Sequence, residues 1–201
     1  MDAYEAILSR RSVREFDGRS VPRELIDRLL RAALVAPAPH HTRPWRFVVL
    51  ETAGSRTRLA DAMGTAWRRD LERDGVAQEQ IESLLARSRR QIEEPPALLL
   101  GCLVGDGLRA WPDKRRRRAE WRMAVQSMGC ALENIMVAAH AEGVASFWIS
   151  APLFCADAVR DALDLPASYE AQALVALGYP STAYAPRERP EPDLSAMTLP
   201  R

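Results

Sequence analysis

The residues best suited to chemistry lie between Ala36 and Phe47, in the stretch A-P-A-P-H-H-T-R-P-W-R-F. His40 and His41 are two of the three histidines in the chain, and Arg43 follows them closely. Imidazoles exchange protons near neutral pH, whereas a guanidinium stays charged. These side chains could therefore bind a flat, anionic ligand and supply it with a proton. The alternative is a proline-rich surface turn that binds nothing.

Prolines decide how this stretch presents its side chains. Pro37, Pro39 and Pro44 fix their own φ at about −65° and favour extended conformations in the residues before them. We therefore expect an extended loop that cannot form a helix. Adjacent residues of an extended chain point to opposite sides, so His40 and His41 would not share a metal ion, and we predict no metal site.

Arginines near both ends of the chain form two further cationic sets. The first set is Arg10, Arg11, Ser12 and Arg14, and the second is Arg187 and Arg189. Guanidinium groups bind phosphate through paired hydrogen bonds, to which a serine hydroxyl can add another. If the C-terminal segment folds back, both sets could hold the same anion. The alternative for each set is a solvated basic surface.

Familiar motifs for binding and catalysis are absent from the sequence. It contains no G-x-x-x-x-G-K-[ST], no G-x-G-x-x-G after a strand and no G-x-S-x-G. A phosphate-bearing ligand would therefore be held by side chains rather than by a glycine-rich loop. The three cysteines show no C-x-x-C spacing, so we expect buried, reduced thiols.

The overall charge also narrows the choice of partners. The 28 Lys and Arg residues nearly balance the 27 Asp and Glu residues. Because a balanced chain has no overall attraction to nucleic acid or to a membrane surface, we expect neither as a partner. No apolar run is long enough to span a membrane, and the first residues, M-D-A-Y-E, lack the pattern of a signal peptide. We therefore expect a cytoplasmic protein.

Apolar periodicity predicts helices and strands in an irregular order. In the first half of the chain, helices are expected over residues 2–9, from Pro22 to the proline loop, and as a pair between Ser55 and Arg90 that is broken near Asp74-Gly75. In the second half, we expect one long apolar helix that ends at Gly143 and another helix from Pro152 to Leu163. Strands are expected at Arg46–Glu51, Ala97–Val104, Ala145–Ser150 and Ala171–Leu177. This order predicts an α+β domain with a central mixed sheet over residues 1–180, and a proline-rich arm of the same domain over residues 181–201.

Five stretches, in this order along the chain, resemble the FMN-dependent nitroreductase family. They are M-D-A-Y-E-A-I-L-S-R-R-S-V-R-E-F, R-P-W-R-F-V-V-L, G-C-A-L-E-N-I-M-V-A-A, G-V-A-S-F-W-I-S and V-A-L-G-Y-P. The resemblance implies a sandwich with a central, mainly antiparallel sheet flanked by helices. It also implies an intertwined homodimer that holds FMN at the subunit interface, with the helix from Ala124 to Ala141 as the dimer core.

The same resemblance implies a role for each candidate site residue. The FMN phosphate and ribityl chain would be bound by Arg10, Arg11 and Ser12 at one end of the chain and by Arg187 and Arg189 at the other. Arg14 would reach the pyrimidine edge of the flavin ring, and Trp148, Ile149 and Ser150 would pass close to its reactive N5 edge. From the second subunit, the ring would be lined by Pro37, Ala38, Pro39 and His41.

The proline loop departs from the general pattern of the family in an informative way. Ala38, His41 and Arg43 stand where many members have serine, asparagine and glutamine, and Glu133 stands where glutamine is usual. The string A-P-A-P-H-H-T-R-P resembles one branch, the C-terminal flavin domain of the bifunctional glutamyl ligase and reductase that completes coenzyme F-420, a deazaflavin with an oligoglutamate tail.

That branch uses FMN to reduce a dehydro precursor of the coenzyme, by hydride transfer from flavin N5. By resemblance, His40, Arg43 and Trp45 would contact a small anionic substrate of this kind, and His40 or His41 is a candidate proton donor. The ligase half would be a separate partner protein. The basic run from Lys114 to Arg118 either binds the acidic tail or forms a solvated surface.

Two other functions stay open at this stage. One is a nitro- or quinone-reductase of broad specificity that takes electrons from NAD(P)H. The other is a non-catalytic protein that carries a flavin or deazaflavin.

Overall fold

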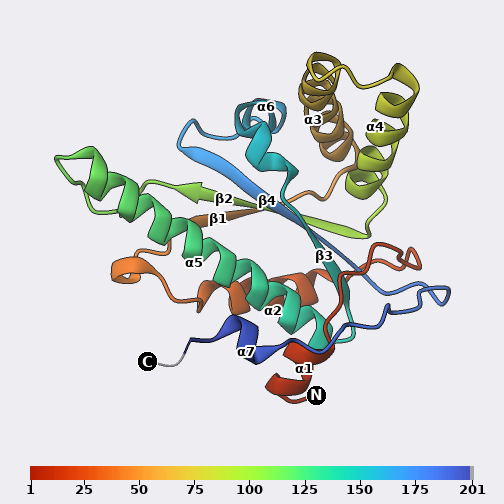
Figure 1. Cartoon of the computed structure of the whole chain (residues 1–201), viewed down its shortest axis with the longest axis horizontal. Coiled ribbons are helices and arrows are strands. Elements are labelled where there is room, and N and C mark those ends of the chain that lie inside the picture. Colours follow the sequence, from red (N-terminus) through yellow and green to blue (C-terminus); the bar gives the residue numbers. More distant parts are fainter. Residues whose placement is uncertain (200–201) are drawn as a thin grey trace.

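The computed structural model describes residues 1–199, which form a four-stranded sheet with helices on both faces (Figure 1). The strands, in spatial order, are β1 (Trp45–Val49), β2 (Ala97–Val104), β4 (Tyr169–Gly178) and β3 (Ala145–Ile149). All three pairings are antiparallel. A parallel element is present as a single bridge between Ser12 and Ser146. The expected α+β class and mainly antiparallel sheet are thus confirmed.

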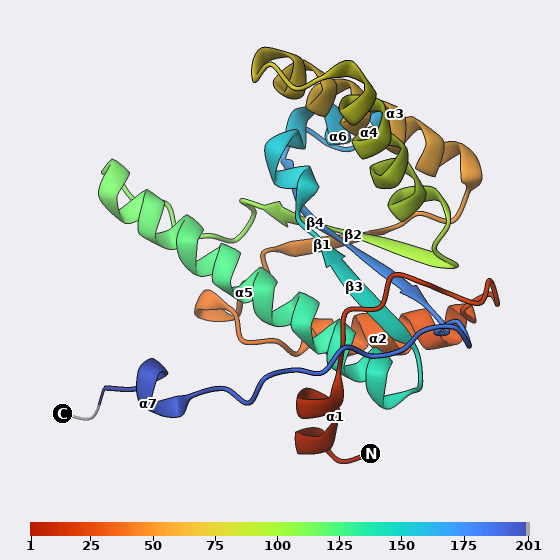
Figure 2. The ribbon, with the colours of Figure 1, turned by 45° about the vertical axis from the view of Figure 1, so that its right-hand side comes forward.

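The helices form two layers around this sheet. They are α1 (Ala3–Ser9), α2 (Arg23–Leu34), α3 (Ala53–Arg73), α4 (Gln78–Glu93), α5 (Lys114–Ala141), α6 (Ala156–Ala162) and α7 (Leu194–Met197), with short 3-10 helices η1 (Pro39–His41) and η2 (Ala151–Phe154). Figures 1 and 2 show α2 and α5 on one face of the sheet, and α3, α4 and α6 on the other. The sheet is therefore the middle layer of three.

The two faces of the sheet belong to two separate cores. In β2, Leu99 and Leu103 pack with α2 and α5, whereas Leu98 and Leu100 pack with residues of α3, α4 and α6. Neighbouring side chains of a strand point to opposite faces, so a strand that is covered on both sides is apolar throughout. This explains why β2 reads as the continuous run A-L-L-L-G-C-L-V.

The long helix α5 packs closely on β2 because Gly101 has no side chain. A Cβ atom there would lie 3.2 Å from Leu132 Cδ2 and 3.2 Å from Met128 Sδ. The basic run Lys114–Arg118 forms the first turns of this helix. Asp113 explains that start, because its carboxylate accepts a hydrogen bond from the backbone N–H of Arg116 at 2.9 Å and so caps the helix.

Two expectations about local structure need correction. Pro22 precedes α2 as its N-cap instead of opening the helix. The helix expected from Pro152 to Leu163 is divided into η2 and α6, because Cys155 has an extended φ of −148° that no helix accommodates. The C-terminal arm contains the short helix α7, and its final residues 200–201 lie outside the described part of the chain.

Candidate functional site

The first arginine set is placed by backbone pairing along the outer strand β3. Val13 N donates a hydrogen bond to Ser146 O at 3.0 Å, beside the bridge between Ser12 and Ser146. Further along, Phe16 forms a bridge with Pro180, next to the end of β4. Residues 12–16 therefore extend the sheet as an irregular fifth segment, which holds the neighbouring arginines at fixed positions.

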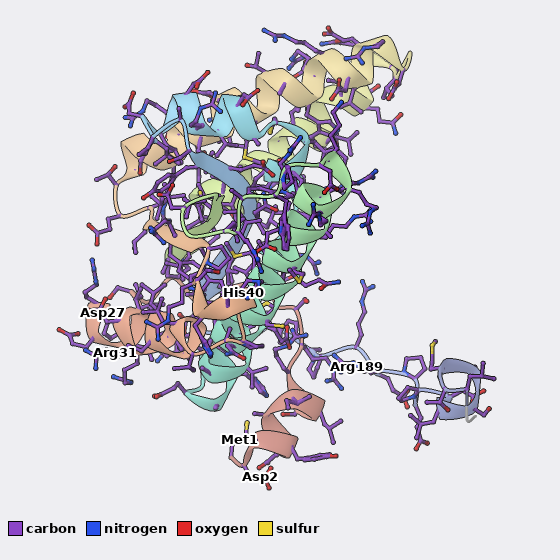
Figure 3. The ribbon with its side chains drawn as sticks, turned by 90° about the vertical axis from the view of Figure 1, so that its left-hand side faces the viewer. Met1, Asp2, Asp27, Arg31, His40 and Arg189 are labelled. Carbon is purple, nitrogen blue, oxygen red and sulfur yellow. The ribbon has the colours of Figure 1, made fainter. Side chains whose placement is uncertain are left out.

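The C-terminal arm folds back and brings the second arginine set to the first. Ser181 N donates to Glu15 O at 3.0 Å, and Arg189 Nη2 donates to Arg10 O at 2.9 Å. Figure 3 labels Arg189 on this arm, on the way to α7. Between the two segments lies a cavity of about 540 Å³, lined by Arg11, Ser12, Arg14, Glu15, Ala183, Tyr184, Ala185 and Arg187.

Two guanidinium nitrogens at this junction are buried without a hydrogen-bond acceptor among residues 1–199, Arg10 Nη1 and Arg11 Nε. Other atoms of these side chains are engaged: Arg10 Nε lies 3.3 Å from Glu133 Oε1, and Arg11 Nη1 donates to the carbonyls of Leu8, Ser9 and Arg10 at the end of α1. A buried donor without an acceptor is costly. The arrangement therefore fits an anion that supplies acceptors.

His140 lies close to the first arginine set but does not contribute to its positive charge. Its Nε2 is 2.8 Å from Ser9 Oγ. Burial lowers the pKa of His140 from its usual value of 6.5, and the nearby charges of Arg10 and Arg11 lower it further. The imidazole is therefore neutral at neutral pH, and the positive charge at the junction comes from guanidinium groups.

A second and larger cavity lies at the end of β3. It measures about 840 Å³ and is lined by Arg14, Met63, Ala66, Trp67, Asp70, Arg73, Asp74, Leu84, Arg87, Ser88, Gln91, Ile149, Ala151, Phe154 and Cys155. Arg14 thus faces both cavities, with its Cζ 5.4 Å from the centroid of the Phe147 ring. Of the expected ring-edge residues, Ile149 reaches this cavity. Trp148 instead packs toward the core on the α5 side, and its Nε1 has no partner among the described residues.

The sequence did not single out the α3 and α4 side chains of this larger cavity. Trp67 continues the four-residue spacing of Leu59 and Met63, which suggests a core position, but it is 37 % exposed and lines the cavity. Arg87 lies in a charged segment that reads as an ordinary solvated helix face. Only the packing of α3 and α4 beside β3 brings these residues together.

The proline loop is a tight turn, so the expectation of an extended loop was wrong. Residues 39–41 form η1, and φ is +52° at His40, +58° at His41 and +49° at Arg43. The prolines leave His40 and His41 free to adopt these values, because each proline fixes only its own φ and restricts the residue before it. Arg43 adopts a positive φ although it directly precedes Pro44. Positive φ values at non-glycine residues cost energy and are often found at functional sites.

Buried Glu120 on α5 helps to hold this turn. Its carboxylate accepts hydrogen bonds from Trp111 Nε1 at 3.0 Å and from Arg109 N at 3.2 Å, and lies 3.7 Å from His40 Nε2. The Trp111 hydrogen bond is the main reason why the pKa of Glu120 is lowered from 4.5. Glu120 is therefore a carboxylate at neutral pH and links the loop to the segment before α5.

Trp45 does not have the substrate contact that we expected. It is the first residue of β1, is 2 % exposed, and packs in the core with α2 and α5. Trp45 directly follows the polar residues of the proline loop, but as the first residue of β1 its indole points into the core. His40, His41 and Arg43, by contrast, are exposed.

Within one chain, the loop and the arginine junction lie at opposite edges of the sheet. The loop leads into β1, whereas residues 12–16 run beside β3, and β2 and β4 lie between these outer strands. Three interstrand spacings separate the outer strands by about 14 Å. Figure 3 accordingly shows His40 and Arg189 apart on the molecule.

The cysteines agree only partly with the expectation of buried thiols. All three are free; Cys102 is buried and Cys155 is partly buried, but Cys130 is exposed on α5. Burial raises the pKa of Cys102 to about 12. Within residues 1–199, no three His, Cys, Asp or Glu side chains gather as a metal site would require, and no helix has the length and apolar character needed to cross a membrane.

Comparison with known proteins places this geometry in a family. The sequence profile of the nitroreductase family matches residues 7–179. The chain belongs to the nitroreductase family. It is also 28 % identical over 195 residues to a Methanothermobacter thermautotrophicus protein named as an NADH dehydrogenase/NAD(P)H nitroreductase, which covers 96 % of this chain and 85 % of that protein. Both findings confirm the expected class, an oxidoreductase.

Solved structures share the fold of this nitroreductase-family chain. A BluB-like flavoprotein from Clostridium difficile superimposes with a TM-score of 0.80 at 24 % identity, covering 100 % of both chains. A Desulfovibrio desulfuricans protein named as a nitroreductase, solved in complex with FMN, gives a TM-score of 0.74 at 22 % identity, covering 100 % of this chain and 97 % of the other. At this identity the likeness concerns the fold.

Proposed function

We propose that this chain is an FMN-dependent oxidoreductase that binds the flavin phosphate where its two arginine sets meet. The observation that carries this proposal is the 540 Å³ cavity lined by Arg11, Ser12 and Arg187, next to two buried guanidinium nitrogens that lack an acceptor among residues 1–199. A phosphate group would provide such acceptors. The family assignment and the FMN-bound neighbour support the choice of anion.

The side chains then divide the work of binding. Arg11, Ser12 and Arg187 would contact the phosphate directly, while Arg189 would hold the backbone of Arg10 in place. Arg14, at the junction of both cavities, would reach the pyrimidine edge of the ring. Ile149 and Ser150 would border the N5 edge. Bound FMN would supply two-electron chemistry, passing a hydride from NAD(P)H to an organic acceptor.

The proline loop joins this site through a homodimer. In a single chain the loop lies at the opposite edge of the sheet, so Pro37, Pro39 and His41 would line the ring of the partner subunit. Exposed apolar side chains on α1 and in the arm favour such an interface, since they would be buried by it. They are Tyr4, Ile7, Leu8, Leu194, Met197 and Leu199. The exposed face of α5 would add to the dimer core.

The acceptor we favour is the dehydro precursor of coenzyme F-420 or a related small anion, in a cytoplasmic setting. His40, His41 and Arg43 are exposed, and these cations at the pocket mouth would attract its phosphodiester and carboxylate groups. His40 or His41 could donate the proton that completes the reduction. A separate glutamyl ligase would then act on the same substrate, and residues 181–201 would serve as an arm of the FMN domain.

A broad NAD(P)H-dependent nitro- or quinone-reductase is the second candidate. The name of the Methanothermobacter relative favours it. Its fold and flavin site would be the same, and the difference would lie in the acceptor. A non-catalytic flavin carrier is the third candidate, and it would bind FMN tightly without turnover.

One experiment separates these functions. Purified protein should be yellow, release FMN on denaturation, and reduce the dehydro precursor faster than nitroaromatics or quinones. Equal turnover of many neutral acceptors would support the broad reductase, and an FMN-bound protein that NADPH and dithionite cannot cycle would support the carrier. A colourless protein that does not bind added FMN would disprove the proposal.

A further inference from the structure

The basic run Lys114–Arg118 begins α5 and has no part in the flavin site described above. Figures 1 and 2 show these first turns of α5 projecting beyond the sheet. Lys114, Arg115 and Arg118 are exposed, and within residues 1–199 their side chains form no hydrogen bond or ion pair. These cations are therefore open to an anion from outside the chain.

The carboxylates next to the basic run do not neutralise it. Elsewhere on the surface, an exposed arginine can have its own carboxylate, as Arg28 has Glu142 at 3.0 Å. Beside the run, Asp113 caps α5 and is paired with Arg116, while buried Glu120 accepts hydrogen bonds from the preceding loop. The positive charge of this surface is therefore left without a counter-charge.

The stability of α5 does not explain why cations gather at its start. Free backbone N–H groups give the first turn of a helix a partial positive charge, so cations there are unfavourable and acids are favourable. The first turn of α5 contains no acidic residue, although the chain continues for five consecutive cations after Asp113. An acidic ligand would offset this repulsion.

The loop before α5 adds cations and fixes their positions. The guanidinium groups of Arg109 and Arg116 lie over the Trp111 ring, with Cζ 4.2 Å and 4.6 Å from its centroid. Trp111 Nε1 donates to buried Glu120, and Arg117 Nη1 donates to the Trp111 carbonyl at 2.9 Å. Two like charges on one ring strengthen the local positive potential. The basic surface is thus built into the fold.

The spacing of the cations along α5 favours an anion in the form of a chain. Residues three or four apart share one face of a helix, so exposed Arg115, Arg118 and Arg122 form a stripe about 10 Å long. We call these three residues the α5 stripe. Alternate side chains of an extended peptide lie roughly 7 Å apart on one side, so successive acidic residues could reach the stripe. A single small anion would meet only part of it.

Two other polyanions suit this surface less well. Single-stranded nucleic acid stacks its bases on open aromatic rings, but Trp111 carries two guanidinium groups and Trp121 packs against the core. A helix that lies on a membrane buries an apolar face in the lipid, but the apolar face of α5 is packed in the core. The net charge of +1 gives no general attraction to either.

We propose that the α5 stripe, together with Arg109 and Arg116, docks an acidic, extended segment of a partner protein. The surface precedes Ala124, where the expected dimer core begins, and the inference does not depend on the flavin. The proline loop borders this surface, since His40 Nε2 lies 3.7 Å from Glu120. A docked segment would therefore lie next to the loop.

The test is isothermal titration calorimetry of the full-length protein, supplemented with FMN, with an octaglutamate peptide at low salt and an octaserine peptide as the uncharged ligand. Arg115→Gln combined with Arg118→Gln should raise the Kd for octaglutamate roughly three- to thirtyfold. Lysine at both positions should keep most of the affinity, and high salt should weaken binding. The matched control is Arg31→Gln combined with Arg69→Gln, which removes the same charge from exposed positions of α2 and α3.

Melting temperatures of the same proteins separate docking from a role in folding. The α5 double variant should melt no lower than wild type, because Arg and Gln have similar helix propensities and cations oppose the helix dipole at this end. A lower Tm with unchanged peptide affinity would overturn the inference. So would a wild type that does not bind octaglutamate, equal losses of affinity in the α5 and control variants, or tighter binding of duplex DNA or phosphatidylserine vesicles. The FMN content of the wild type tests the proposed function separately.

Discussion

Residues 10–16 and residues 37–43 both present cations, but the fold holds them in different ways. The first segment pairs through its backbone with neighbours in the sheet: Val13 bonds to Ser146 and Glu15 bonds to Ser181. The backbone hydrogen bonds of the second segment, within the described chain, stay inside its own turn. Outside that turn, the carboxylate of Glu120 lies 3.7 Å from His40 Nε2.

This difference suits two kinds of ligand. Residues 10–16 combine a rigid backbone with buried donors that lack acceptors, an arrangement that fits a ligand which stays bound, such as a cofactor. Residues 37–43 expose their cations on a turn with three positive φ values outside glycine. Their side chains can adapt to a ligand that comes and goes. We therefore expect mutations in the first segment to change flavin affinity, and mutations in the second to change acceptor preference.

The largest expected effect is on flavin binding. Arg10→Ala removes a partly buried guanidinium whose Nη1 is buried and lacks an acceptor in the described chain, and we expect the Kd for FMN to rise roughly ten- to a hundredfold. Arg189→Ala should have a smaller effect, because its one hydrogen bond in the described structure goes to the Arg10 carbonyl. Flavin fluorescence titration measures both, with Arg31→Ala, at an exposed position of α2, as control. Unchanged affinity in both variants would show that the site is misplaced.

The next effect tests how residues 10–16 are anchored. A Cβ atom on Gly178 would lie 2.7 Å from Phe16 Cδ1 and 2.8 Å from Pro96 Cδ. Gly178→Ala should therefore lower stability by about 1–3 kcal/mol and weaken FMN binding, because the Phe16 segment must shift. Gly64→Ala is the control, since its Cβ meets nothing within 4 Å on helix α3 and should leave stability equal or higher. Similar melting temperatures for the two variants would contradict this anchoring.

The sequence predicted the elements better than it predicted the turns. The apolar runs of β2 and β4 and the break between α3 and α4 were found because burial and Gly75 leave local signals. The left-handed turn at His40 leaves none, since histidine has no backbone requirement for positive φ. The division at Cys155 was likewise missed, because the flanking residues suit a helix.

The candidate site was predictable where charged residues cluster within one short segment of the chain, and it was hidden where packing brings distant segments together. Clustered arginines at both ends suggested a shared anion, and the structure brings Arg11 and Arg187 to one cavity. The larger cavity depends on how α3 and α4 pack beside β3, which no local pattern specifies. Trp45 shows the opposite error, because the resemblance implied a substrate contact for a side chain that the strand buries.

Loosening the proline loop should alter acceptor use without releasing FMN. Glu120→Gln keeps the size of the side chain but removes its charge beside His40 and weakens the bonds from Trp111 and Arg109. We expect a loss of about 1 kcal/mol in stability and a several-fold rise in KM for anionic acceptors. Exposed Glu79→Gln on α4 is the matched control. A changed Kd for FMN with an unchanged KM would reverse the roles assigned to the two segments.

A smaller effect is expected when the loop cations themselves are replaced. His41→Asn and Arg43→Gln together should raise KM a few-fold for an anionic deazaflavin precursor and less for a neutral quinone, because exposed charges are screened by solvent. The difference should also diminish at high salt. Steady-state kinetics at two salt concentrations would reveal it. Equal changes for both acceptors would mean that these side chains support only the shape of the turn.

The smallest effect concerns acid stability. Because the pKa of Glu120 is lowered from 4.5 in the folded protein, chiefly by the Trp111 hydrogen bond, the folded state binds the proton less readily than the unfolded chain. The stabilisation is therefore present above the unfolded pKa and is lost as the pH falls through the folded value. The difference in Tm between wild type and Glu120→Gln should be largest near about pH 7 and should shrink below about pH 4. Melting curves across this range measure it, and a difference that persists in acid would assign the effect to packing instead of ionisation.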